Sequence, residues 1–230
     1  MKNLMKVIFA ILVFAAISGC TGYGVTFQSA PSTELSNCYP ALVGNWRIIE
    51  GERNDSTSGD QDFLSVNADC SSILSVTFKT ESGKSSSKVD DMKDGKNGSI
   101  QFAKGSTYDY VVVTPKEDSF EITKEIKLPS GKIIYQINKG KDGVILRSVD
   151  LDKTAQLVLQ KKISGQLYID NDAPDGRSAS NIYVRGDAQK TGIYLDTLDI
   201  YSDKRLLLVP ASANETRKIQ KAIKNSGKKK

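Results

Sequence analysis

Histidine is absent from this chain of 230 residues, although the chain contains 32 lysines and arginines. Histidine is the usual general base of nucleophilic hydrolases and the commonest side-chain ligand of zinc. Its absence excludes Ser-His-Asp and Cys-His catalytic systems and His-ligated metal centres. We therefore expect a protein that is not an enzyme and that uses no metal and no cofactor.

Long apolar segments are also missing. The longest apolar run covers residues 7–17, and its eleven residues are too few to span the roughly 30 Å of hydrocarbon in a bilayer. Lys2 and Lys6 precede this run, and small residues ending at Cys20 follow it. This arrangement is typical of a secretory signal peptide with its cleavage site.

The four residues Ile-Ser-Gly-Cys that end at Cys20 resemble the lipobox of bacterial lipoproteins. The resemblance implies that residues 1–19 are a signal peptide, removed before Cys20, and that acyl chains such as palmitate on Cys20 anchor the mature protein in a membrane. Thr21 follows, not the aspartate that resembles an inner-membrane retention signal, so we expect the outer membrane and its periplasmic face. The alternative is an ordinary secretory signal with an unmodified Cys20.

The segment after the lipidated cysteine is rich in glycine, serine and threonine and has no clear period. Such a composition favours a flexible linker. We therefore predict that residues 20–37 form a tether between the membrane and the folded domain.

Cysteine is scarce as well, and Cys38 and Cys70 are the pair that remains beside Cys20. In a secreted protein an even pair favours a disulfide. The bridge would close a loop of about 31 residues and stabilise the fold by roughly 3 to 4 kcal/mol. Two separately buried thiols are the alternative.

The charge is uneven along the chain. Residues 20–216 contain 23 basic and 27 acidic residues, whereas residues 217–230 contain seven basic residues and no acid. Outside the cytoplasm the acidic neighbours available to this basic tail are peptidoglycan and anionic lipid, and not nucleic acid. The terminal Lys230 is similar to the lysine by which the major outer-membrane lipoprotein of enteric bacteria is joined to peptidoglycan. A solvated tail is the favoured interpretation, and a covalent link and an electrostatic contact are the alternatives.

Short segments of alternating apolar and polar residues recur from Trp46 to Lys161, which is typical of half-buried strands. Glycine beside Asn, Asp or Ser marks the turns between them. We count about eight strands, including one over residues 155–159. A meander with such short connections favours an antiparallel barrel.

The first of these strands follows Gly44 and contains Trp46, the only tryptophan. This pattern resembles the G-x-W start of lipocalin-like proteins. The resemblance implies an all-β, lipocalin-like antiparallel barrel over residues 38–163, in which Gly44 permits the turn into the first strand and Trp46 closes one end. Eight-stranded barrels of this kind can hold one small ligand, so we expect a small apolar or lipid-like molecule. The alternative is that inward-facing Phe, Tyr and Leu side chains fill the interior.

Residues 164–230 are predicted to be a C-terminal extension packed on the barrel. Three strands are expected, at 166–170, 181–185 and 205–209, while residues 191–201 suit either a strand or a helix. Ser212 and Glu215 match a capping box, which predicts a short helix to about Asn225 with lysines on its outer face.

Three further sequence patterns are weaker indications of chemistry. Ser85 and Lys88 satisfy S-x-x-K, which places a lysine near a nucleophile on a helix, but the surrounding serines favour a flexible loop. Asp90 and Asp91 look like a solvated turn and not a glycosidase pair. Residues 170–176 carry oxygen ligands but lack the EF-hand spacing.

The favoured function is a non-enzymatic, membrane-anchored lipoprotein that binds a small apolar ligand in or on a barrel. A structural, adaptor or inhibitor-type lipoprotein that acts through protein or cell-wall contacts is the alternative.

Overall fold

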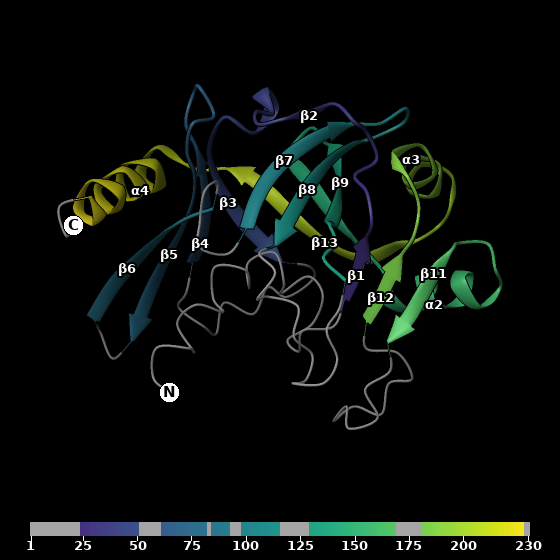
Figure 1. The fold of residues 1–230 in the computed structure, drawn as a ribbon. Helices are drawn as coiled ribbons and strands as arrows, with labels where there is room; N and C mark the ends of the chain where they lie inside the picture. The colour runs from purple at the N-terminus through teal and green to yellow at the C-terminus, as the bar shows by residue number, and fades with distance from the viewer. Residues whose placement is uncertain are drawn as a thin grey trace.

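The computed structural model describes residues 24–50, 61–81, 84–92, 98–115, 129–168 and 181–227. Thirteen strands in two sheets and three α-helices occupy most of these residues (Figure 1). The strands are β1 (Gly24–Phe27), β2 (Leu35–Ser36), β3 (Gly44–Glu50), β4 (Gln61–Val66), β5 (Ile73–Glu81), β6 (Lys84–Asp91), β7 (Gly98–Lys104), β8 (Asp109–Pro115), β9 (Ile133–Lys139), β10 (Val144–Val149), β11 (Gly165–Tyr168), β12 (Asn181–Val184) and β13 (Tyr201–Pro210). The helices are α2 (Leu151–Leu159), α3 (Ala188–Thr197) and α4 (Ala213–Ser226).

The main sheet is antiparallel and has ten strands in the order β2-β7-β8-β9-β10-β13-β3-β4-β5-β6. A flat sheet would hold β7 and β5 roughly 30 Å apart. Instead, Phe102 of β7 and Ile73 of β5 belong to one buried cluster. The sheet therefore curls into a half-barrel around that cluster, and the predicted all-β, barrel-like fold is confirmed.

Several strands of the half-barrel are buried on both faces. Val111 and Tyr135 point into the curl, whereas their neighbours Tyr110, Val112 and Ile134 belong to a second cluster on the outer face. Side chains alternate between the faces of a strand, so a strand covered on both sides needs apolar residues at successive positions. This double burial explains the continuous apolar run in β8.

The second cluster is covered by a small three-stranded sheet, β1-β12-β11, and by helices α2 and α3 (Figure 1). β1 runs parallel to β12, and Phe27 forms an additional bridge to Lys132, the residue before β9. Phe27 is completely buried. The predicted tether over residues 20–37 is therefore wrong from Gly24 onward, because a four-residue strand is too short to show a period and its partner lies more than 150 residues away.

Residues 155–159 form the end of helix α2, so the predicted strand there is wrong. Asp150 caps the helix by accepting a hydrogen bond from the Lys153 amide at 2.9 Å. Ala155 and Val158, spaced as on a helix, pack against the outer cluster, whereas Leu159 is 71% exposed. The alternating pattern would have buried Leu159, which shows that the period of two was coincidental here.

The boundary predicted at residues 163 and 164 does not separate two units. β13, which belongs to the predicted extension, lies inside the main sheet between β10 and β3. The other expected strands correspond to β11 and β12, and the ambiguous segment 191–201 is largely helix α3. The C-terminal residues thus complete the half-barrel.

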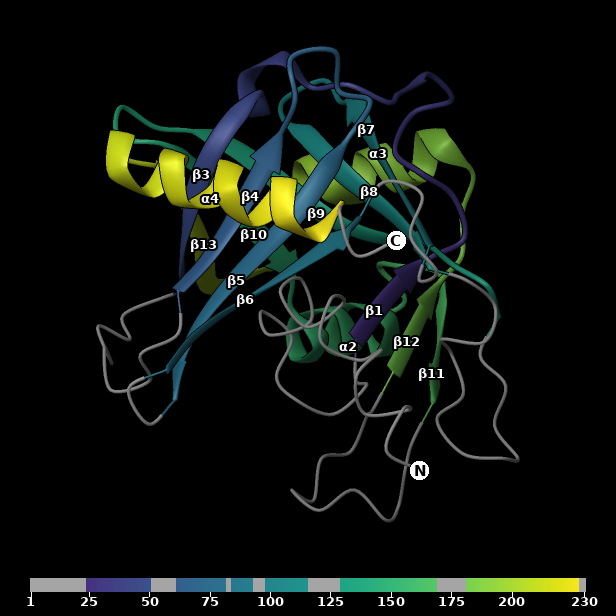
Figure 2. The same cartoon turned by 90° about the vertical axis from the view of Figure 1, so that its left-hand side faces the viewer.

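Helix α4 begins as predicted, with a reciprocal capping box between Ser212 and Glu215. It crosses the outer face of β5 and β6, where Ile219 and Ala222 pack on Phe63 and Val76 (Figure 2). None of the helices in the described residues is both long and apolar enough to cross a bilayer.

Candidate functional site

The concave face of the half-barrel is the natural place for a ligand, and buried apolar side chains line it. Among the residues that the structure describes, a cavity of about 20 Å³ lies on this face. Its lining is entirely apolar and consists of Leu42, Leu64, Val66, Ile73, Ile100, Phe102, Val111 and Leu146. A cavity of this size holds about one water-sized group. A lipid-like ligand does not fit here unless these side chains move.

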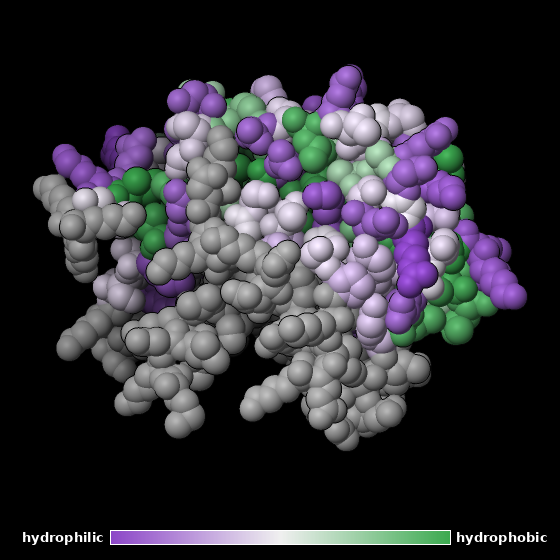
Figure 3. Space-filling model, in the orientation of Figure 1, coloured by the Kyte–Doolittle hydropathy of each residue, from purple (hydrophilic) through white to green (hydrophobic). Residues whose placement is uncertain are grey.

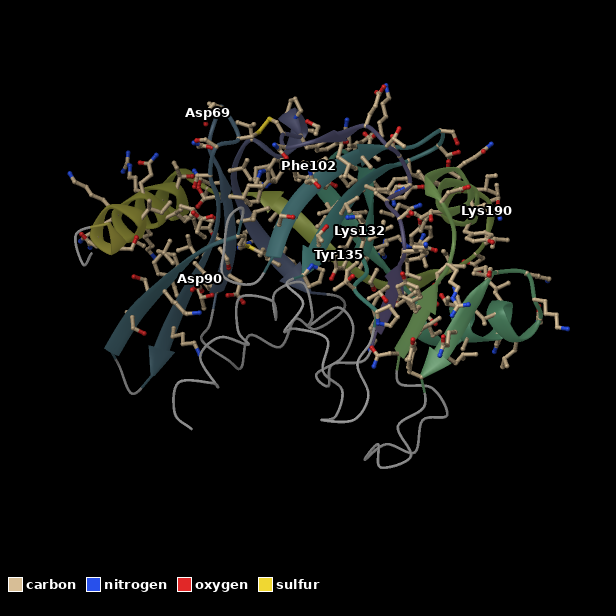
Figure 4. All side chains as sticks on the ribbon, in the orientation of Figure 1. Asp69, Asp90, Phe102, Lys132, Tyr135 and Lys190 are labelled. Atoms are coloured by element: carbon tan, nitrogen blue, oxygen red, sulfur yellow. A yellow bond between two sulfur atoms is a disulfide. The ribbon has the colours of Figure 1, made fainter. Side chains whose placement is uncertain are left out.

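The predicted disulfide is confirmed and bridges one rim of the half-barrel. The sulfur atoms of Cys38 and Cys70 are 2.01 Å apart and their Cα atoms 5.2 Å apart. Cys38 follows β2, which pairs with β7, whereas Cys70 lies in the turn between β4 and β5. The bond is visible near Asp69 in Figure 4. It therefore connects parts of the curled sheet that lie far apart in strand order.

Tyr39, beside the disulfide, closes the same rim. Its ring stacks on Phe102 with centroids 5.5 Å apart, and its hydroxyl donates a hydrogen bond of 2.6 Å to Asp109. The Lys139 ammonium lies 5.0 Å from the centre of the Tyr39 ring. Burial and the Asp109 carboxylate raise the pKa of Tyr39, so the hydroxyl remains a proton donor at physiological pH.

Gly44 and Trp46 lie at the start of β3, next to the cluster inside the curl. Gly44 has a φ of +127°, a backbone conformation that L-residues with a side chain rarely adopt. The Trp46 ring packs against the inner cluster, and its Nε1 donates a hydrogen bond of 2.8 Å to the Leu42 carbonyl. Gly44 permits the backbone turn at the start of β3, and Trp46 packs on the inner cluster, so both residues have structural roles in the half-barrel. The lipocalin-like assignment itself stays a prediction.

A polar cluster around Asp196 was not predicted from the sequence. Its carboxylate accepts hydrogen bonds from the hydroxyls of Tyr110 and Ser106 and from the Ser106 amide. Burial, the neighbouring Tyr201 and the Asp196 carboxylate raise the pKa of Tyr110, which is fully buried. The cluster fastens helix α3 to the turn between β7 and β8. The sequence carries no signal for it, because Ser106 and Asp196 are 90 residues apart.

The Ser85 and Lys88 pair does not have the geometry of an S-x-x-K dyad. The predicted loop is strand β6, and residues three apart on a strand face opposite sides of the sheet. Lys88 is paired with Asp90 at 2.5 Å, and Asp91 belongs to the same strand, not to a turn.

Within the described residues, no cluster of three or more acidic or cysteine side chains is arranged to hold a metal ion. The oxygen-rich segment 170–176 lies outside the described residues, and so do the predicted signal peptide over residues 1–19 and Cys20.

Comparisons of this chain with protein-family models, with curated proteins and with solved structures give no match.

Proposed function

We propose that this protein is a lipid-anchored, non-enzymatic protein of the bacterial outer membrane that binds a partner through the outer surface of its half-barrel. One observation carries the proposal: the cavity that the inner cluster lines, within the described residues of the concave face, measures only about 20 Å³. A structural or adaptor role therefore fits the described geometry better than a lipid carrier does.

The lipobox at Cys20 supports the anchor, and the start of β1 adds a constraint on it. Only three residues separate Cys20 from Gly24, the first residue of β1. Four residue steps span at most about 14 Å. Because β1 is part of the folded domain, an acylated Cys20 would hold that domain close to its membrane.

The anchor is tested by making Cys20→Ala in the full chain and separating membrane from soluble fractions. The parent protein should fractionate with membranes and gain the mass of its acyl chains, and the variant should lose both. Thr21→Ala keeps the cysteine and serves as the matched control. A Cys20→Ala protein that is still cleaved, membrane-bound and equal in mass to an acylated form would contradict the anchor.

A second candidate function is the binding of a small apolar molecule, and the wholly apolar lining of the cavity favours it. A ligand larger than one water-sized group would require the inner cluster to expand. Native mass spectrometry of the periplasmic protein separates the two functions. The surface-binding proposal predicts the mass of the acylated chain alone, whereas a tightly held extra mass would favour the carrier.

A further inference from the structure

The outer face of helix α4 carries a stripe of positive charge. Successive helical residues are rotated by about 100°, so Arg217, Lys221 and Lys224 lie within about 60° of one another around the helix axis. All three are exposed. The buried residues Ile219 and Ala222 lie on the opposite side, against the sheet. The stripe is therefore held outward by the packing of the helix.

This positive charge is not neutralised within α4. Glu215 is the only acid of the helix, and its oxygens already accept from the Ser212 amide at 2.7 Å and approach Arg47 at 3.5 Å. Exposed Lys218 flanks the stripe, and three more lysines follow the helix at residues 228–230. In the space-filling view, hydrophilic side chains project along the upper edge of the region of α4, beside a hydrophobic patch (Figure 3).

The stripe and the start of β1 lie at opposite ends of the molecule. Both α4 and the small sheet cover the outer face of the half-barrel, but α4 packs on β5 and β6 whereas β1 reaches β9. In the strand order of the main sheet, β10, β13, β3 and β4 lie between β9 and β5, and the sheet curls along this order. Outer faces at the two ends of a curled sheet point in different directions. Figure 1 shows α4 at the left of the half-barrel and β1 to the right of its central strands.

We propose that the outer face of α4 docks on peptidoglycan, a polymer with fixed carboxylates, on the side of the protein away from its own membrane. This proposal rests on the surface-binding function and the anchor proposed above. A connection of at most about 14 Å at β1 keeps the small-sheet end beside the bilayer. The stripe at the other end then faces the envelope space, where a carboxylate polymer is the complementary partner.

The test measures co-sedimentation of the full, membrane-extracted protein in nonionic detergent with purified peptidoglycan sacculi. The triple variant Arg217→Gln, Lys221→Gln, Lys224→Gln should bind roughly 10- to 100-fold more weakly than the parent, because each cation near an anionic surface contributes to the attraction. Raising the salt concentration should weaken binding of the parent in the same way. The substituted side chains are exposed, so the melting temperature should stay within a few degrees of the parent value.

A control triple removes the same charge elsewhere: Lys141→Gln, Lys162→Gln, Lys190→Gln, all exposed and none on α4. Lys190 lies on α3, across the molecule from Asp90 of β6 (Figure 4). This control should bind sacculi within about twofold of the parent.

Equal binding by the α4 triple and the parent overturns the docking surface. So does a protein that binds vesicles of phosphatidylglycerol through these residues but does not bind sacculi. The acyl mass is read on the same samples. Missing acylation with intact sacculus binding would contradict the anchor alone, whereas acylation without sacculus binding would contradict the docking proposal alone.

Discussion

The two coverings of the outer face are built in different ways. At one end a single helix, α4, buries Ile219 and Ala222 on Phe63 and Val76. At the other end three strands and two helices from distant parts of the sequence bury a cluster of thirteen residues that includes Phe27. The difference indicates that the small-sheet end is integral to the half-barrel, whereas α4 is a local attachment whose outer face remains available.

Breaking the small-sheet end should have the largest effect. Phe27→Ala removes a completely buried ring from the outer cluster, and such substitutions cost about 3 to 5 kcal/mol of unfolding free energy. Phe78→Ala, at a partly buried position under α4, is the matched control and should cost less. Urea denaturation of both variants measures the difference. Equal losses of unfolding free energy in the two variants would mean that the small-sheet end and the α4 end contribute equally to stability.

The disulfide should have the next largest effect, because it connects the rim beside β7 with the turn between β4 and β5. Replacing both Cys38 and Cys70 by serine releases a loop with a sequence separation of 32, which costs about 3 to 4 kcal/mol on the chain-entropy model. Denaturation of the parent with and without reductant measures how much the disulfide contributes to its unfolding free energy. A double variant that is as stable as the oxidised parent would show that packing alone holds the rim.

Removing the buried contact of α4 should cost less than removing Phe27. Ile219→Ala deletes most of a fully buried side chain and should cost about 2 to 3 kcal/mol of unfolding free energy. This value is near the low end for such substitutions, because the small cluster can collapse around the gap. Hydrogen exchange should report faster opening of α4 while the small sheet stays protected. Ile193→Ala, at a half-exposed position on α3, is expected to change stability by less than about 0.5 kcal/mol.

The same contrast explains which features the sequence could predict. The capping box of α4 and the disulfide depend on neighbouring residues or on a single cysteine pair, and both are found. The alternating pattern also predicts an antiparallel meander, which is found, although residues 155–159, which were expected to be one of its strands, form a helix. The small sheet depends on a parallel pairing between Gly24–Phe27 and Asn181–Val184 that has no local signature. β13 was likewise placed in an extension, because its position between β10 and β3 is decided by packing across the whole chain.

The candidate site shows the same limit. Gly44, Trp46 and the two cysteines were singled out from short motifs, and the structure places them at the start of β3 and on one rim. The Asp196 cluster and the inner cluster depend on side chains brought together from several strands and helices. Only the packed structure shows that the cavity lined by the described residues is too small for a lipid-like ligand.

The smallest expected effect concerns the start of α4. Ser212→Ala removes the hydroxyl that accepts from the Glu215 amide at 3.3 Å, which should cost about 1 kcal/mol at neutral pH. Part of this cost depends on pH. Burial alone would raise the pKa of Glu215, but the hydrogen bonds to Ser212 and the charges of Arg47 and Lys218 outweigh it, so the folded-state pKa is lowered.

A lowered carboxylate pKa stabilises the fold fully above the ordinary value of 4.5, and this contribution is lost as the pH falls through the folded-state pKa. The Ser212→Ala variant should have a less depressed Glu215 pKa, so the stability gap to the parent should narrow below about pH 4.5. Urea denaturation at pH 7 and pH 3.5 measures this change. If the difference in unfolding free energy between the parent and the variant stays constant with pH, the whole effect comes from the hydrogen bond to the Glu215 amide. The charge of Glu215 would then not contribute to the stability of α4.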